Sequence, residues 1–270
     1  MKSRNVPVAN LITREAVRAK LGTKIIGRQF LAFRTIHSTN DLAYRLASEG
    51  GFDGTVVIAE EQTAGRGRLG RKWESCFGKG LWFSVIFRPD LPSTQAGLFS
   101  FLAGISVADA FSRKIQLVAD LKWPNDLLIG KKKVCGILSE AEFDENRIKF
   151  IILGIGINVN HSAEDFPETI RQQATSIYML LKQRVNRVDL LVEILQQLEF
   201  NYFRSQQQGF KGILADWCTK CSYLGKQVKF VSSTDIIEGI FETIADDGSA
   251  IIRLHNGIRQ RILVGDMIPD

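Results

Sequence analysis

Residues 65–73 read Gly65-Arg66-Gly67-Arg68-Leu69-Gly70-Arg71-Lys72-Trp73, a segment in which three glycines are interleaved with three arginines before a closing tryptophan. Glycine allows a backbone to adopt positive φ and to approach a ligand closely, and each guanidinium offers a permanent charge and a planar fork that matches carboxylate or phosphate. The segment follows the apolar run 55–59, so we expect it to leave the end of a β-strand, where ligand-binding loops are common. These features predict an anion-binding loop.

Two other interpretations of this loop remain open at this point. Basic, glycine-containing runs are often solvated turns or nucleic-acid-binding arms, and the glycines at 65, 67 and 70 formally fit the Gly-x-Gly-x-x-Gly pattern of dinucleotide-binding turns. A dinucleotide turn needs little charge of its own, because a helix N-terminus supplies the positive field for the pyrophosphate. The added arginines favour a more strongly anionic ligand, or a loop that closes over it.

Four other segments combine polar side chains with apolar runs, namely Ser38-Thr39-Asn40, Lys122-Trp123-Pro124-Asn125-Asp126, Lys133-Val134-Cys135-Gly136-Ile137-Leu138 and Gly154-Ile155-Gly156-Ile157-Asn158. In this order, and together with the loop, they resemble biotin protein ligase. The resemblance covers nearly the whole chain, from about residue 36 to the C-terminus. Gly-Arg-Gly-Arg with Lys-Trp-Pro-Asn-Asp is highly specific for that family.

Composition limits the class of protein. The chain has 270 residues, 45% of them hydrophobic and 24% charged, which is ordinary for a globular protein of one large domain or a large and a small one. No apolar run reaches the 18 or so residues of a membrane span, and the polar N-terminus lacks the apolar centre of a secretory signal. Four cysteines are too few for a disulfide scaffold, so we expect a cytoplasmic protein. The net charge of +6 favours an acidic partner or a polyphosphate substrate.

Hydrophobic periodicity predicts a mixture of strands and helices. Strands are expected at 30–33, 55–59, 81–87 and 148–157, a hairpin at 126–140, and helices after Ser38 or Thr39, over 92–114 and over 186–202. The elements show no βαβ regularity, which favours an α+β fold in which helices flank a mixed β-sheet. The resemblance implies a class II synthetase-like arrangement of this catalytic domain.

The character of the chain changes after Trp217, where short strands are expected at 227–231, 236–244, 250–254 and 259–264. Turn signals at 232–233, 246–248 and 255–257 separate them and indicate a small barrel. The resemblance implies that this tail is SH3-like. We therefore expect a short N-terminal segment over residues 1–28, a catalytic biotin- and ATP-binding domain over 29–220 and a C-terminal SH3-like domain over 221–270.

Joining a carboxylic acid to an amine in water requires an activated acyl group, which adenylation by ATP provides. The carboxylate attacks the α-phosphate, so the site has to neutralise two anions and the charge that develops between them. Arginine forks and a lysine charge suit this role. The resemblance implies an ATP-dependent ligase that makes biotinyl-5′-AMP and transfers biotin to a specific lysine of the biotin carboxyl carrier protein of a biotin-dependent carboxylase, releasing AMP and pyrophosphate, with ATP and Mg²⁺ as cofactors.

The resemblance also implies roles for individual residues. The catalytic residues would be Lys133, Arg68 and Asp126, and the Mg²⁺ ligands stay unassigned. The biotin-binding residues would be Ser38, Thr39, Asn40, Gln62, Gly65, Arg66, Gly67, Arg68, Lys133 and Gly136, with Trp82, Ile137 and Leu138 as candidate apolar walls. The nucleotide-binding residues would be Arg68, Arg71, Trp73, Asn125 and Asn158, with Trp73 packed on adenine.

Each assignment has a structural alternative. Ser38 could serve only as an N-cap, Asp126 could only form a turn, and Asn158 could serve hairpin geometry. Cys218 and Cys221 form a Cys-x-x-Cys pair, but no second pair lies at a zinc-like spacing and the three histidines are far apart, so we interpret it as incidental.

Two other functions remain in view. The fold could serve a lipoate or other acyl-protein ligase, which transfer assays would distinguish. The second alternative is a biotin-sensing repressor. The 28 or so residues ahead of Phe30 leave no room for a helix-turn-helix, so we expect no nucleic-acid partner. The sequence leaves open whether the chain forms a homodimer through a sheet edge.

Overall fold

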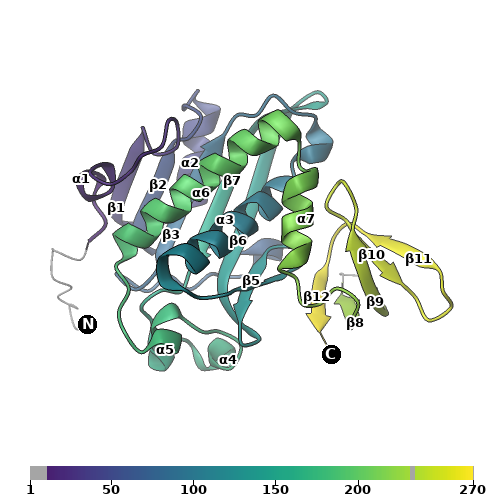
Figure 1. The fold of residues 1–270 in the computed structure, drawn as a ribbon. Coiled ribbons are helices and arrows are strands. Elements are labelled where there is room, and N and C mark those ends of the chain that lie inside the picture. Colours follow the sequence, from purple (N-terminus) through teal and green to yellow (C-terminus); the bar gives the residue numbers. More distant parts are fainter. Residues whose placement is uncertain (1–10, 232–234, 270) are drawn as a thin grey trace.

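The computed structural model describes residues 11–231 and 235–269, and its largest element is a seven-stranded mixed sheet (Figure 1). The strands lie in the order β1-β2-β3-β7-β6-β5-β4. Their bounds are β1 Phe30–Ile36, β2 Val56–Gln62, β3 Leu81–Phe87, β4 Asp120–Lys122, β5 Asp126–Ile129, β6 Lys132–Asp144 and β7 Arg147–Ile157. β1 and β2 are parallel and the other neighbours are antiparallel, so the predicted α+β class is confirmed.

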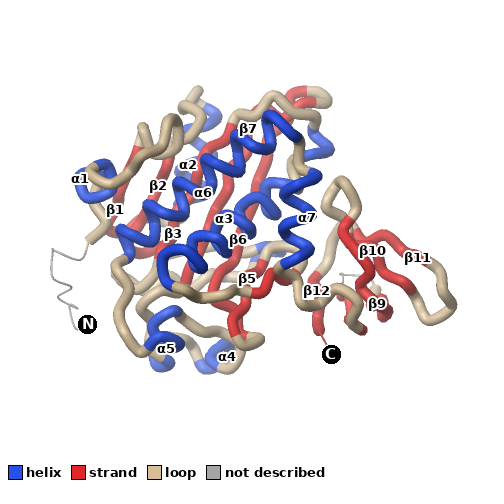
Figure 2. The backbone as a smooth tube through the Cα atoms, viewed as in Figure 1, coloured by secondary structure: helices blue, strands red, loops and turns tan. Residues whose placement is uncertain are grey.

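Helices cover both faces of this sheet (Figures 1 and 2). Their bounds are α1 Arg14–Arg18, α2 Thr39–Ser48, α3 Leu98–Ile115, α4 Glu168–Arg171, α5 Ile177–Leu181, α6 Arg187–Gln208 and α7 Lys211–Thr219. α3 and α6 lie over one face, whereas α2 packs on the other with Ala43 and Ala47. Because side chains alternate along a strand, Val56 joins the α3 side and Val57 the α2 side.

Most predicted helix starts are confirmed, and the ends differ. Ser38 caps α2 by accepting from the Asp41 N–H, and Asn186 caps α6. α6 runs to Gln208, beyond the predicted end at residue 202, because Ser205 continues its buried face until Gly209. A separate 3₁₀ turn covers Ser93–Gln95, so α3 begins only at Leu98. The short elements β4, α4, α5 and α7 were not predicted.

One segment, Ser93–Ile115, is by length and composition apolar enough to cross a membrane, which the sequence expectation excluded. In this structure 72% of its apolar window is buried, and its helix α3 contributes Phe99, Leu102 and Phe111 to the main core. The segment is therefore accounted for as a core helix.

The C-terminal strands form a second, five-stranded antiparallel sheet consistent with the expected SH3-like domain. Its order is β11-β10-β9-β8-β12, with bounds β8 Gln227–Val231, β9 Ile236–Ile244, β10 Ala250–Arg253, β11 Arg259–Ile262 and β12 Asp266–Pro269. Four strands were predicted. β12, which pairs with β8, was not predicted. The turn expected at 232–233 lies outside the described residues.

The two sheets share one continuous apolar core. The Trp123 ring packs edge-on against Phe230 at 5.3 Å, and its Nε1 donates to the Gly248 carbonyl at 3.0 Å. These contacts hold the C-terminal sheet beside β4 and β5. The domain boundaries at residues 28/29 and 220/221 stay predictions.

The segment ahead of β1 is bound to the large sheet and its helices. The Glu199 carboxylate accepts from three consecutive backbone N–H groups, those of Lys24, Ile25 and Ile26, at 2.5–2.9 Å. Buried Glu60 accepts from the Ile12 N–H and pairs with Arg187 at 2.6 Å. Buried carboxylates require hydrogen-bond or ion-pair partners. The bonds that Glu199 and Glu60 accept from backbone N–H groups fix this segment in place.

Candidate functional site

Two neighbouring glycines form a floor on the α2 face of the large sheet. Trp82, Gly156, Gly136 and Asp126 are paired across β3, β7, β6 and β5 in one transverse row. The Trp73 indole lies against the two glycines: a Cβ at Gly136 would be 2.7 Å from it, and a Cβ at Gly156 would be 2.5 Å away. Only glycine at both positions therefore allows the indole to lie here.

The loop that carries Trp73 is a tight hairpin. The Trp73 N–H donates to the Gly65 carbonyl at 2.9 Å, and the Gly67 N–H donates to the Arg71 carbonyl at 2.7 Å. Leu69 and Gly70 lie at its tip with φ of 55° and 71°, as in a type I′ turn. Positive φ is thus needed only at Gly70 among the three glycines, whereas Gly65 is required for close approach, since a Cβ there would be 2.6 Å from the Trp73 carbonyl oxygen.

Cationic side chains gather beside the floor. Lys133 Nζ lies 2.6 Å from Asp126 Oδ1 and 5.4 Å from the Trp73 ring centroid. Arg68 donates to Asn125 Oδ1 at 3.2 Å, and Asn125 in turn donates to the Ile137 carbonyl at 2.5 Å. The predicted catalytic residues Lys133, Arg68 and Asp126 are therefore brought together.

Lys122 joins this cluster. Burial lowers the pKa of Lys122, and nearby Lys133 and Arg71 lower it further, while Asp126 and Asp266 oppose the change. Burial likewise lowers the pKa of Arg68, against the attraction of Asp266 and Asp126. Cations thus outnumber carboxylates here, which is the condition for binding an anion.

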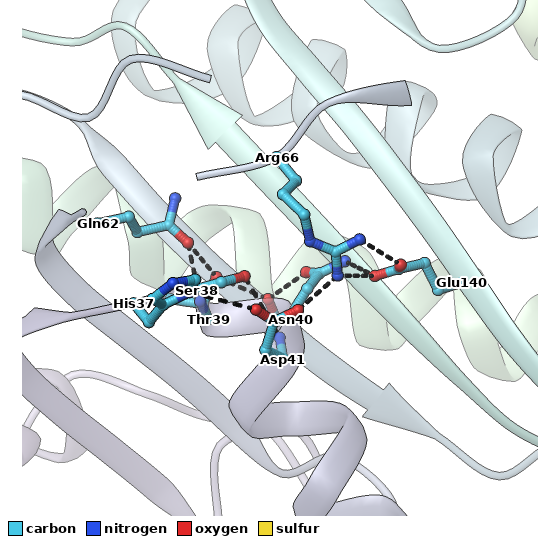
Figure 3. Close-up of polar contacts among 9 residues, drawn as sticks. His37, Ser38, Thr39, Asn40, Asp41, Gln62, Arg66 and Glu140 are labelled. Atoms are coloured by element: carbon cyan, nitrogen blue, oxygen red, sulfur yellow. Dashed lines mark hydrogen bonds and ion pairs between the residues drawn. The ribbon is translucent and has the colours of Figure 1, made fainter. Parts of the chain in front are cut away.

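A polar wall at the start of α2 borders the floor (Figure 3). The Thr39 N–H and hydroxyl both donate to Gln62 Oε1, at 2.8 and 3.0 Å. Asn40 accepts from the Ser84 hydroxyl at 2.5 Å and donates to Glu140 at 2.7 Å. Ser38, Thr39, Asn40 and Ser84 are buried, whereas Gln62 and Glu140 are half-buried.

The structure separates Arg66 from Arg68, although the sequence expectation placed both around a carboxylate and a phosphate. The Arg66 guanidinium points toward Asp41 and Glu140, at 2.5 and 3.1 Å (Figure 3). Burial works to lower the pKa of Arg66, but these two carboxylates outweigh it and raise that pKa. The Arg66 side chain therefore fixes the base of the hairpin to α2 and β6, and its role toward biotin stays a prediction.

Two further residues lie differently from what the sequence suggested. Ile137 lies in the core on the α3 side, because its neighbours Gly136 and Leu138 take the α2 side. Gly136 lies against the Trp73 indole, and its role toward biotin stays a prediction. Buried Asn158 hydrogen-bonds through its backbone to Val134 and Ile177, beside the strand that carries Lys133.

Sequence reasoning quoted Lys122 and Gly156 within motifs but gave them no role, and it missed Asp41, Ser84, Glu140, Gly265 and Asp266. Gly154 and Gly156 had a usable signal, since two glycines spaced by two in an apolar strand share one face. Asp41 and Glu140 had none, because an exposed acidic residue on a helix or strand is ordinary.

The Cys-x-x-Cys pair lies at the end of α7. Burial raises the pKa of Cys218 and raises that of Cys221 to about 12, so both favour the neutral thiol. Residues 11–231 and 235–269 contain no group of three or more His, Cys, Asp or Glu side chains arranged to hold a metal ion.

His161 lies behind the floor in an aromatic cluster. Its ring stacks on Phe166 at 5.2 Å and meets the edge of Trp82 at 5.6 Å. Burial lowers the pKa of His161 from 6.5 to about 4, with Asp165 opposing the change. The imidazole is therefore neutral near neutral pH.

This burial makes stability depend on pH. Between pH 6.5 and about 4 the unfolded chain binds a proton at His161 that the folded chain does not, so stability falls as pH falls. We expect this group to remove about 3 kcal/mol from the free energy of unfolding across that window. Urea unfolding of wild type and His161→Phe should show a smaller acid loss in the variant; equal losses would contradict the assignment.

The chain is similar in sequence and in fold to known proteins. Residues 32–158 match the family model for the biotin/lipoate A/B protein ligase family, and residues 223–268 match the biotin protein ligase C-terminal domain. The bifunctional ligase/repressor BirA of Bacillus subtilis is 32% identical over 249 residues, covering 92% of this chain and 77% of that protein. A biotin–[acetyl-CoA-carboxylase] ligase of Mycobacterium tuberculosis is 34% identical, covering 78% of each chain. The Aquifex aeolicus biotin protein ligase, solved with biotin and ATP, has a TM-score of 0.77 and 31% identity, covering 89% of this chain and 98% of that one.

Proposed function

Because the chain belongs to the biotin/lipoate A/B protein ligase family, we propose that the cationic cluster and the polar wall carry out the family's chemistry here. The chain is an ATP-dependent biotin protein ligase: it binds biotin and ATP, forms biotinyl-5′-AMP and transfers biotin to acetyl-CoA carboxylase. The observation that best supports our residue assignment is the placement of Lys133, Arg68 and Lys122 around Asp126, beside the floor.

In the first step a biotin carboxylate oxygen attacks the α-phosphorus of ATP and pyrophosphate leaves. Lys133 would hold the attacking oxygen, a role that its ion pair with Asp126 at 2.6 Å supports by fixing the ammonium group. Arg68, fixed by Asn125, and Arg71 would neutralise phosphoryl oxygens as negative charge develops. Preorganised cations of this kind act without reorganising during the reaction.

The polar wall would bind biotin, and the Trp73 indole would bind the adenine of ATP. Ser38, Thr39, Asn40 and Gln62 offer the hydrogen-bonding groups that the ureido and valeryl parts of biotin require. Trp73 rests one face on the glycines, which leaves its other side to stack on adenine. Gly65 and Gly67 would bring the hairpin backbone close to the biotin carboxylate, and Asn158 would face the nucleotide.

Mg²⁺ is the remaining expected cofactor. It favours substrate phosphates, waters and one or two carboxylates over a full protein cage. The described part of the chain groups no three metal ligands, which fits an ion held mainly by phosphate with Asp126 nearby. When bound, it would neutralise the charge of the pyrophosphate group.

In the second step the amine of the carrier lysine attacks the acyl carbonyl and AMP leaves. The intermediate has to be kept from water in between, a role we assign to the hairpin. We expect Arg68→Ala to weaken biotin binding and to release biotinyl-5′-AMP about tenfold faster, because one charge-assisted contact is lost. Loss of labelled adenylate from the purified complex measures this, with exposed Arg113→Ala as the control. An unchanged adenylate lifetime would remove Arg68 from the site.

Transfer assays test the activity. Radiolabelled biotin and radiolabelled lipoate are each incubated with ATP and a carboxyl carrier domain. We expect the carrier lysine to be labelled by biotin and not by lipoate. Lipoate transfer at an equal rate would favour the related acyl-ligase function.

Three further proposals concern partners and location. We propose that the chain binds no operator DNA, since residues 11–29 are held against the large sheet by Glu60 and Glu199; a gel shift tests this.

We propose β1, an edge strand of the large sheet, as the surface through which a homodimer would form, and light scattering tests this. The chain has four cysteines, too few for a disulfide scaffold, which supports a cytoplasmic location that fractionation would test.

A further inference from the structure

The tip of the hairpin contacts the C-terminal sheet through one dipeptide. Arg71 forms an ion pair with the Asp266 carboxylate, and Arg68 Nη1 lies 3.6 Å from Asp266 Oδ1. Both terminal nitrogens of Arg68 also lie 3.4 Å from the Gly265 carbonyl oxygen, within reach of a hydrogen bond. Gly265-Asp266 therefore meets both arginines that we assign to phosphate.

The position of Asp266 is rigid. It begins β12, where Met267 is fully buried and pairs with Phe230 of β8, and Phe230 packs on Trp123. Gly265 has φ of 147°, a conformation that favours glycine and that directs its carbonyl to Arg68. The carboxylate is thus presented from a strand docked on the large sheet, not from a free tail.

Three cations lie around the Asp266 carboxylate, and their mutual repulsion explains why a negative charge stabilises this arrangement. Arg68, Arg71 and Lys122 repel one another, and Arg68 and Lys122 are partly removed from water. Asp266 attracts all three and so favours the closed position of the hairpin tip. The base of the hairpin is held separately by Arg66 on Asp41 and Glu140 (Figure 3).

We propose that Asp266 is a positioning residue through which the C-terminal sheet holds Arg68 and Arg71 over the nucleotide, and so keeps the hairpin closed on biotinyl-5′-AMP. This rests on the proposed phosphate-binding roles of the two arginines. It gives the C-terminal sheet a specific part in the first step of the reaction, distinct from any contact with the carrier protein.

The test uses the full chain loaded with labelled biotin and ATP. We expect Asp266→Asn to release labelled biotinyl-5′-AMP about tenfold faster and to raise the KM for ATP, with little change in the thermal midpoint, whereas Asp266→Glu keeps the wild-type behaviour. The matched control is Asp247→Asn in the same sheet, whose side chain is 31% exposed against 26% for Asp266 and pairs with Arg261.

A double-mutant cycle separates positioning from general stability. In an Arg71→Gln background the effect of Asp266→Asn should shrink, because the shared contact is already lost. A wild-type adenylate lifetime in Asp266→Asn, or an equal effect of Asp247→Asn, would overturn the inference. Failure of the wild-type chain to form any biotinyl-5′-AMP would instead contradict the proposed function.

Discussion

Replacing Lys133 with methionine should slow formation of biotinyl-5′-AMP by about 10²- to 10³-fold, as expected for loss of one preorganised charge at the reacting oxygen. Methionine keeps the length and apolar stem of the side chain, so packing against Trp73 is retained. The loss should be in kcat, because Lys133 acts where charge develops and not where the biotin rings bind. Pyrophosphate release at saturating biotin and ATP measures this step alone.

The adjacent Lys132→Met is the matched control. Lys132 is exposed and is the first residue of β6, directly before Lys133. Because side chains alternate along a strand, its side chain points to the opposite face from Lys133. We expect it to keep wild-type rates. Normal pyrophosphate release in Lys133→Met would remove Lys133 from the catalytic residues, and an equal loss in both variants would indicate a long-range charge effect.

Gly156→Ala carries the second largest expected effect. Its Cβ would lie 2.5 Å from the Trp73 indole, so the ring has to leave the floor. The hairpin then loses its aromatic anchor and the nucleotide loses its stacking surface. Loss of a well-packed indole contact is worth a few kcal/mol, so we expect biotinyl-5′-AMP to bind about 10- to 100-fold more weakly.

Titration calorimetry with biotin and adenylate measures the affinity, and thermal unfolding confirms that the fold persists. Gly97→Ala is the control, because a Cβ at Gly97 would meet nothing within 4 Å and its φ of −61° suits alanine. Wild-type affinity in Gly156→Ala would show that the indole is free to leave the glycines without cost.

Local patterns were sufficient to predict most of the large sheet. Apolar runs marked β3 and β7, and polar caps marked the starts of α2 and α6 at Ser38 and Asn186. These signals depend on neighbours a few residues away, which is the range over which hydrogen bonding and periodicity act. Two short strands, β4 and β12, were not predicted.

The sequence by itself indicated the kind of chemistry: its motifs contain Arg68, Asn125, Asp126 and Lys133, whose residue types favour binding an anion, and the resemblance implied that they act together. Only the tertiary structure decided how these groups are paired. It turned Arg66 toward Asp41 and Glu140, laid Trp73 on Gly136 and Gly156, and brought Asp266 to Arg71 across 195 residues of chain. Such contacts depend on strand register and on the docking of two sheets, and no local pattern carries that information because both are properties of the assembled core.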